Sequence, residues 1–91
     1  MAKVEIYTKS WCPYCARAKA LLDRRGVGYE EIDVTTDAVR ELEMTIRSER
    51  HTVPQIFIDD AHLGGHDELV AADRHGQLDP LLSGEAQGES A

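Results

Sequence analysis

Two stretches of alternating apolar and polar residues flank one amphipathic segment near the start of the chain. Residues 4–8 are Val-Glu-Ile-Tyr-Thr and residues 29–34 are Tyr-Glu-Glu-Ile-Asp-Val, which predicts two β-strands. Pro13 suits the first position of a helix, and small and apolar residues recur at helical spacing after it. They are Cys15, Ala18, Leu21 and Leu22. A strand, a helix and a second strand thus follow one another within about thirty residues. This is the length of a right-handed crossover unit with two parallel strands, so an α/β fold is predicted.

A second helix is predicted from Thr36 or Asp37, either of which can cap its first turn, to about Glu49. Three large apolar side chains recur within it at three- and four-residue steps, as is typical of a helix. They are Val39, Leu42 and Ile46. We expect four glutamates on this helix and on the strand before it to lie on solvated faces: Glu30, Glu31, Glu41 and Glu43.

A hairpin and a third helix are predicted to complete the domain. The apolar stretches 56–58 and 61–63 flank Asp-Asp at 59–60, which predicts two antiparallel strands joined by a two-residue turn. Residues 56–58 are expected to be buried. A third helix follows from about His66 to Arg74, and residues 79–82 are expected to form a short turn. The predicted order of elements is therefore βαβαββα.

The chain of 91 residues is long enough for one hydrophobic core and too short for two. We assign the domain to residues 1–82 and expect residues 83–91, which contain no large apolar side chain, to be a disordered tail. The formal charge of −7 disfavours nucleic acid and anionic membranes as partners. No apolar run approaches the roughly 18 residues of a membrane helix, and a signal peptide is not recognisable, so we expect a cytoplasmic monomer.

The only two cysteines, Cys12 and Cys15, lie at the predicted junction of the first strand and the first helix. A bridge between them would close a loop too short to add much stability, and two cysteines are too few for a secreted disulfide scaffold. At a helix N-terminus, unpaired N–H groups and the helix dipole favour a thiolate on Cys12, and Lys9 adds positive charge nearby. Cys15, nearly one turn farther on, is expected to be the deeper, resolving thiol.

A zinc site is the alternative use of the cysteine pair. His62 and His66 have the spacing of the second half of a zinc finger. The separation from Cys15 to His62 is much longer than in a finger, and His62 falls in a predicted strand, so we expect no metal site. His51, His62 and His75 are expected to lie at the surface.

Three motifs at the predicted junctions make the chain similar to a known family. They are Cys12-Pro13-Tyr14-Cys15 with Lys9 before it, Thr52-Val53-Pro54, and Gly64-Gly65-His66-Asp67. With these motifs in this order over residues 4–82, the chain resembles a dithiol glutaredoxin of the small bacterial kind. The resemblance implies a thioredoxin fold, with a four-stranded mixed sheet and helices on both faces, and a cis peptide bond between Val53 and Pro54.

The resemblance also implies an activity, the glutathione-dependent reduction of protein disulfides and of glutathione mixed disulfides. Cys12 would be the nucleophile and Cys15 the resolving thiol, with glutathione as co-substrate and no tightly bound cofactor. The implied protein partners carry disulfides or glutathionylated cysteines, with ribonucleotide reductase as one candidate.

The same motifs imply which residues bind glutathione. Its glycine carboxylate suits Lys9, and the Val53 backbone would pair with the extended tripeptide. The γ-glutamyl carboxylate would lie on backbone N–H groups near Gly65, His66 and Asp67 at the start of the third helix, with the Asp67 carboxylate meeting the amine. Three further residues would flank or position the ligand: Tyr14, Thr52 and Pro54.

Two alternatives remain open from the sequence. Trp11 directly before Cys12 is more typical of thioredoxins, which a flavoprotein reductase reduces, although a thioredoxin would have Gly-Pro between its cysteines. The other alternative is an iron–sulfur cluster held between subunits by Cys12 and glutathione. Pro13 and Cys15 disfavour the cluster, because relatives that hold one typically have a single cysteine followed by Gly-Phe-Ser.

Overall fold

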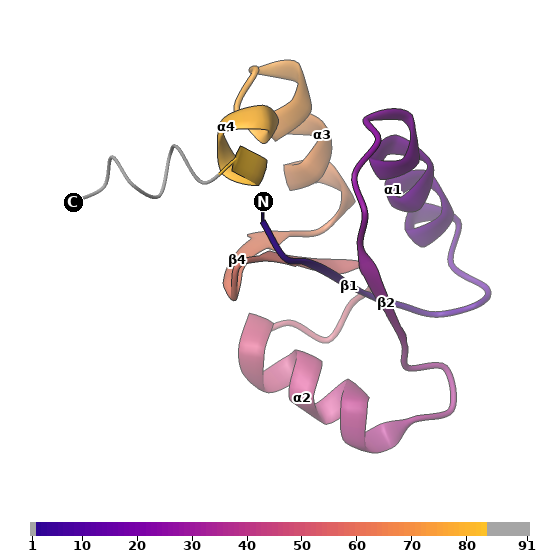
Figure 1. Ribbon diagram of the computed structural model, residues 1–91. Helices are drawn as coiled ribbons and strands as arrows, with labels where there is room; N and C mark the ends of the chain where they lie inside the picture. Colours follow the sequence, from indigo (N-terminus) through magenta and orange to yellow (C-terminus); the bar gives the residue numbers. More distant parts are fainter. Residues whose placement is uncertain (1, 84–91) are drawn as a thin grey trace.

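The structure is a computed structural model that describes residues 2–83 (Figure 1). Within this range the chain forms eight elements in the order βαβαββαα. The strands are β1 (Val4–Thr8), β2 (Glu30–Asp33), β3 (Gln55–Ile58) and β4 (Ala61–Gly64). The helices are α1 (Pro13–Arg24), α2 (Ala38–Ser48), α3 (His66–Arg74) and α4 (Leu78–Ser83). The predicted tail lies outside the described residues except for Ser83, which ends α4 instead.

The four strands of the described range form one mixed sheet in the order β2-β1-β3-β4. Strand β1 is parallel to β2, and β3 is antiparallel to both β1 and β4. Helix α2 covers one face of the sheet, and α1 lies on the other face with α3 and α4 (Figure 1). The predicted thioredoxin fold is therefore confirmed.

Both faces of the sheet are covered, and each has its own core. On the side of α1, α3 and α4 the core is large and apolar, with these buried residues: Val4, Ile6, Ala18, Leu21, Leu22, Ile56, Ile58, Leu69, Ala72 and Leu78. On the side of α2 it is smaller: Tyr7, Ile32, Val34, Met44 and Phe57. All five residues of β1 are buried, including Glu5. Alternate residues of β1 therefore point into two different cores, and neither set of residues points into solvent.

Helix α2 is confirmed, but the three apolar side chains that predicted it point away from the protein. Val39, Leu42 and Ile46 are 76%, 59% and 69% exposed. The buried residues of this helix are Met44 and Ser48, on the opposite side. The apolar stripe of α2 is therefore directed into solvent, and other contacts hold the helix on the sheet.

Polar side chains join α2 to the buried face of β1. Arg47 donates hydrogen bonds to the Glu5 carboxylate at 3.1 Å and to the Tyr7 hydroxyl at 2.8 Å, and its guanidinium carbon lies 3.9 Å from the centre of the Phe57 ring. The Tyr7 hydroxyl donates to Glu43, which was expected to be solvated. Because Glu5 is buried, its pairing with Arg47 offsets the cost of removing a carboxylate from water.

The expected turn at residues 79–82 is wrong, since these residues belong to α4. Pro80 is the third residue of that helix, where a missing N–H removes no intrahelical hydrogen bond. Leu78 is buried and Leu82 packs against the large core, with its carbonyl accepting a hydrogen bond from the Ala2 N–H at 3.0 Å. Burial of these leucines stabilises a helix too short to be recognised from periodicity.

The predicted two-residue hairpin between β3 and β4 is confirmed. Asp59 and Asp60 have φ of 51° and 69°, the left-handed conformation that a tight hairpin turn of this length requires. The Asp59 carboxylate accepts a hydrogen bond from the Lys3 backbone N–H at 2.8 Å. This contact ties the hairpin to the start of β1.

Glu49 ends α2 in the left-handed conformation, with φ 58° and ψ 26°, which disfavours any residue with a Cβ. We expect Glu49→Gly to raise the free energy of unfolding by about 0.5–1 kcal/mol, because glycine adopts this conformation without strain. Urea denaturation would measure the change. Glu49→Ala removes the same charge but keeps the Cβ, so an equal gain in both variants would contradict this explanation.

Candidate active site

Cys12 caps the N-terminus of α1. Its backbone is extended, with φ −91° and ψ 113°, and Pro13 begins the helix, so the predicted helix start is confirmed. The Cys12 Sγ accepts a hydrogen bond from the Cys15 N–H at 3.3 Å, and the Cys12 N–H donates to the Lys9 carbonyl at 3.2 Å. The sulfur therefore occupies the position where a helix N-terminus stabilises negative charge.

The Val53 backbone lies on the other side of the Cys12 sulfur. The Cys12 Sγ is 3.7 Å from the Val53 carbonyl oxygen. The peptide bond between Val53 and Pro54 is cis, as predicted. A ligand that paired with the Val53 backbone would therefore lie within reach of this sulfur.

The second cysteine differs from the first in its surroundings. Cys15 lies on the buried face of α1 and is 1% exposed, whereas Cys12 is 8% exposed. Burial raises the pKa of the Cys15 thiol to about 12, so this thiol is protonated at neutral pH. The two thiols are not joined in a disulfide. The predicted contrast between an outer and a deeper cysteine is confirmed.

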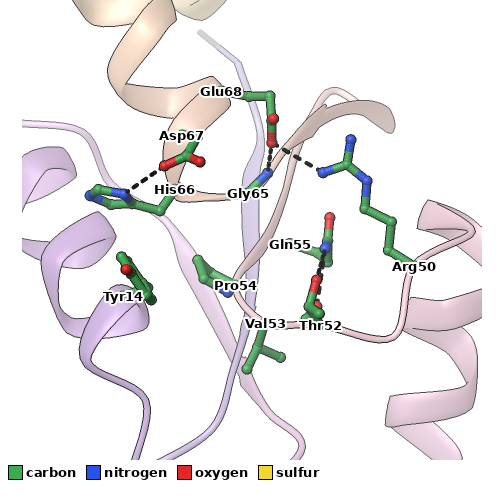
Figure 2. A pocket seen from close by; sticks show the side chains of 10 residues that line it. All are labelled: Tyr14, Arg50, Thr52, Val53, Pro54, Gln55, Gly65, His66, Asp67 and Glu68. Carbon is green, nitrogen blue, oxygen red and sulfur yellow. Dashed lines mark hydrogen bonds and ion pairs between the residues drawn. The ribbon is translucent and has the colours of Figure 1, made fainter.

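A pocket of about 330 Å³ opens beside the cysteines, between α1, the loop before β3 and the start of α3 (Figure 2). Seven of the residues predicted to bind a ligand line it: Tyr14, Thr52, Val53, Pro54, Gly65, His66 and Asp67. Three lining residues were not predicted: Arg50, Gln55 and Glu68. Lys9 is not part of this lining, so the structure brings together all the predicted binding residues except one.

Glu68, which lines the pocket, caps the N-terminus of α3 with its side chain. Its carboxylate accepts hydrogen bonds from the Gly65 N–H at 2.5 Å and from Arg50 at 3.1 Å (Figure 2). The bond from Gly65 holds the pKa of this carboxyl below its usual range. Gly64 has φ +129°, and a Cβ there would lie 2.4 Å from the Glu68 carboxylate, so glycine is required. The Gly65-x-x-Glu68 spacing, which is that of a capping box, could have predicted this role.

Gln55 links the pocket to β4. Its buried amide donates hydrogen bonds to the Thr52 carbonyl at 3.0 Å and to the Thr52 hydroxyl at 3.2 Å, while its oxygen is 2.7 Å from His62 Nε2. His62 was expected at the surface, but it is half-buried against Phe57, and burial lowers its pKa. The chain of contacts from His62 through Gln55 fixes the position of Thr52.

Tyr14 and His66 form one wall of the pocket (Figure 2). Their ring centroids are 5.4 Å apart, and the Arg17 guanidinium lies 5.3 Å from the centre of the Tyr14 ring. His66 Nδ1 is 3.5 Å from the Asp67 carboxylate. The wall therefore combines an aromatic surface with charged groups at the start of α3.

Lys9 lies beside the cysteines but is already paired. Its Nζ is 2.8 Å from a Glu41 carboxylate oxygen on α2 and 5.6 Å from the centre of the Trp11 ring. Glu41 was expected to be solvated. No sequence pattern predicts this ion pair, because the two residues are far apart in the chain and belong to different parts of the fold. Trp11 is exposed directly before Cys12.

Within residues 2–83, no group of three or more His, Cys, Asp and Glu side chains is placed to hold a metal ion. His62 contacts Gln55 and His66 contacts Tyr14, so the two histidines of the zinc alternative have different partners. In the same range, no helix has the length and apolar character needed to cross a membrane.

Comparison with known proteins gives consistent matches over most of the chain. A family model described as glutaredoxin matches residues 4–63. The chain is 58% identical over 82 residues to glutaredoxin 3 of Escherichia coli strain K12, covering 90% of this chain and 99% of the relative. It is 48% identical over 83 residues to a glutaredoxin of Pseudomonas aeruginosa, with coverages of 91% and 99%.

Two solved structures are similar over the same region. The solution structure of glutaredoxin from Brucella melitensis has a TM-score of 0.81 and 52% identity, covering 90% of this chain and 89% of the other. The crystal structure of a buckwheat glutaredoxin–glutathione complex has a TM-score of 0.84 and 28% identity, with coverages of 93% and 80%. Both similarities support the thioredoxin fold described above.

The raised pKa of Cys15 predicts an unusual pH dependence of its alkylation. A Cys12→Ser variant keeps the burial of Cys15 but removes the contributions of Cys12 to its raised pKa. In this variant we expect the rate with iodoacetamide still to rise with pH above about 8.5, where the rate of a free thiol levels off. Mass spectrometry of quenched samples would measure the rate. The same variant unfolded in guanidinium chloride is the control and should show the ordinary profile. A plateau in the folded variant near pH 9 would contradict the assignment.

Proposed function

This chain belongs to the glutaredoxin family, whose members are thiol oxidoreductases, and we propose that it is a glutathione-dependent thiol–disulfide oxidoreductase. We propose Cys12-Pro13-Tyr14-Cys15 as its active-site motif, with the reduction of protein disulfides and glutathione mixed disulfides as its reaction. The observation that carries the proposal is the position of the Cys12 sulfur, at the N-terminus of α1 and 3.7 Å from the Val53 carbonyl. The pocket of Figure 2 opens beside it.

In the first step the Cys12 thiolate attacks one sulfur of the substrate disulfide. A bond forms between this sulfur and Cys12 Sγ, and the other substrate sulfur leaves as a thiolate that takes up a proton. The Cys15 N–H, which donates to Cys12 Sγ, stabilises the negative charge on the attacking sulfur and on the same sulfur when it later leaves. The product is a mixed disulfide on Cys12.

In the second step Cys15 resolves a mixed disulfide formed with a protein. Its sulfur attacks Cys12 Sγ, the substrate sulfur leaves, and the proton of Cys15 goes to that leaving thiolate. The high pKa of Cys15 keeps it protonated until the leaving group can accept the proton. Cys12 and Cys15 are then joined in a disulfide, and the substrate is fully reduced.

Two molecules of glutathione restore the reduced protein. The first attacks Cys12 Sγ, releases Cys15 as a thiol and leaves glutathione bound to Cys12. The second attacks the glutathione sulfur of this mixed disulfide, which releases glutathione disulfide and the Cys12 thiolate. The two electrons gained by the substrate are therefore those lost by two glutathione thiols.

The pocket and Lys9, which lies outside its lining, would together present complementary groups to the two ends of glutathione. The Val53 backbone would pair with the peptide, and Tyr14, Thr52 and Pro54 would flank it. The N-terminus of α3, at Gly65, His66 and Asp67, would take the γ-glutamyl carboxylate, with the Asp67 carboxylate on the amine. Lys9 would take the glycine carboxylate. The structure of a buckwheat glutaredoxin in complex with glutathione supports glutathione as the ligand.

Separate removal of each cysteine tests the two roles. We expect Cys15→Ser to keep most of its activity on glutathione mixed disulfides, because glutathione alone completes that reaction, and to lose most of its activity on protein disulfides. Cys12→Ser should lose both activities. The first activity is measured as the rate at which glutathione disulfide forms, followed through the NADPH consumed when that disulfide is enzymatically reduced. The second activity is measured as the release of thiols from an oxidised protein.

Ala16→Ser, next to Cys15 on the exposed side of α1, is a matched control that should retain both activities. If Cys15→Ser kept both activities, or if Cys12→Ser kept either, the assigned roles would be wrong. If the wild-type protein reduced disulfides only with dithiothreitol and not with glutathione, the proposed dependence on glutathione would fail.

A further inference from the structure

The cation closest in sequence to Cys12 already has a carboxylate partner. Lys9 lies three residues before Cys12, and its carbonyl accepts the Cys12 N–H at 3.2 Å, so its backbone is fixed to the active-site loop. Its Nζ forms an ion pair with Glu41 at 2.8 Å, and most of the surface of the Lys9 side chain is covered. Partial burial strengthens such a pair relative to one in open water.

A second cation near the site is paired in the same way. Arg50, on the far side of the pocket, binds the Glu68 carboxylate at 3.1 Å. The exposed Asp67 carboxylate adds a further negative charge to the pocket lining, and the chain as a whole carries −7. An incoming anion therefore meets two cations, Lys9 and Arg50, whose charges the protein already compensates.

We propose that Glu41 is a specificity-determining residue that competes with the glycine carboxylate of glutathione for Lys9. The inference rests on the proposed function, in which Lys9 receives that carboxylate. Each molecule of glutathione must displace Glu41 or share the cation with it, which lowers the affinity for glutathione. A disulfide substrate without a carboxylate at this position does not meet the competition, so Glu41 shifts the preference of the site toward such substrates.

The position of Glu41 allows its removal without loss of α2. The helix is capped by Asp37, whose carboxylate accepts the Arg40 N–H at 3.0 Å, and it is joined to the sheet by Arg47 and Met44. The contact between Glu41 and Lys9 adds an ion pair at the helix start and no buried apolar surface. Its effect on binding can therefore be separated from an effect on folding.

The kinetics of Glu41→Gln test the proposal, with a disulfide-bonded peptide that carries no glutathione as the oxidant. We expect the KM for glutathione to fall about fivefold, which corresponds to about 1 kcal/mol at 1.4 kcal/mol per tenfold, with little change in kcat. With dithiothreitol, an uncharged reductant, the kinetics should match those of the wild type. Glu41→Asp, which keeps the charge on a shorter side chain, should give an intermediate KM.

Two controls make the interpretation specific. Glu30→Gln changes the net charge by the same amount on the exposed strand β2, away from the pocket, and should leave the KM unchanged. In a Lys9→Met background, Glu41→Gln should give no further decrease in the KM for glutathione, because the cation for which Glu41 and glutathione compete is absent. An unchanged KM in Glu41→Gln, an equal decrease in Glu30→Gln, or a decrease that persists without Lys9 would each overturn the proposal.

The same measurements distinguish failure of the proposed competition at Lys9 from failure of the proposed oxidoreductase function. If the wild-type protein turned over glutathione and only the KM of Glu41→Gln failed to change, the competition would be wrong and the oxidoreductase assignment would stand. If the wild-type protein reduced the peptide with dithiothreitol and never with glutathione, both would fall together.

Discussion

The hydrogen bond from the Cys15 N–H to the Cys12 sulfur is the contact on which the site depends. It satisfies a backbone donor that the helix itself leaves unpaired, so the same bond caps α1 and orients the sulfur. Strand β1, which is buried on both faces, ends close to this cap, and the Val53 carbonyl approaches from the opposite side. The Cys12 sulfur is therefore positioned by backbone groups of α1 and of the loop before β3, next to a strand that is buried on both faces.

The difference between the two thiols follows from their positions on one helix. Cys12 precedes the first turn and lies at its open end, whereas Cys15 is on the face that packs against the sheet. Burial there keeps Cys15 protonated, and this difference underlies the proposed roles of Cys12 as nucleophile and Cys15 as resolving thiol. A spacing of two residues between the cysteines is enough to produce this contrast, because three positions along a helix lead from its end into the core.

The fold was predictable where local pattern and packing agree. The strands, α1, α3, the hairpin and the cap at Cys12 follow from periodicity and turn chemistry, and the cis bond followed from the family resemblance. Helix α2 was also predicted, although the apolar side chains that predicted it are exposed. Helix α4 was missed because burial of its leucines, and not its sequence pattern, stabilises it. Residues whose roles depend on distant partners were also missed. Glu41, Glu43 and His62 look like surface residues in the sequence, and only the tertiary fold brings Lys9, Tyr7 and Gln55 to them.

The outward direction of the apolar stripe on α2 has a consequence for the two layers that cover the sheet. Helix α2 contributes one large apolar side chain, Met44, to its core and is otherwise held by charged and hydrogen-bonded groups, whereas the opposite layer is held by a continuous apolar core. Apolar burial tolerates the exchange of one aliphatic side chain for another of similar volume, whereas the contacts of Arg47 with Glu5 and Tyr7 require the fixed donor geometry of a guanidinium. The two faces of one small sheet therefore differ in how freely their residues can be exchanged.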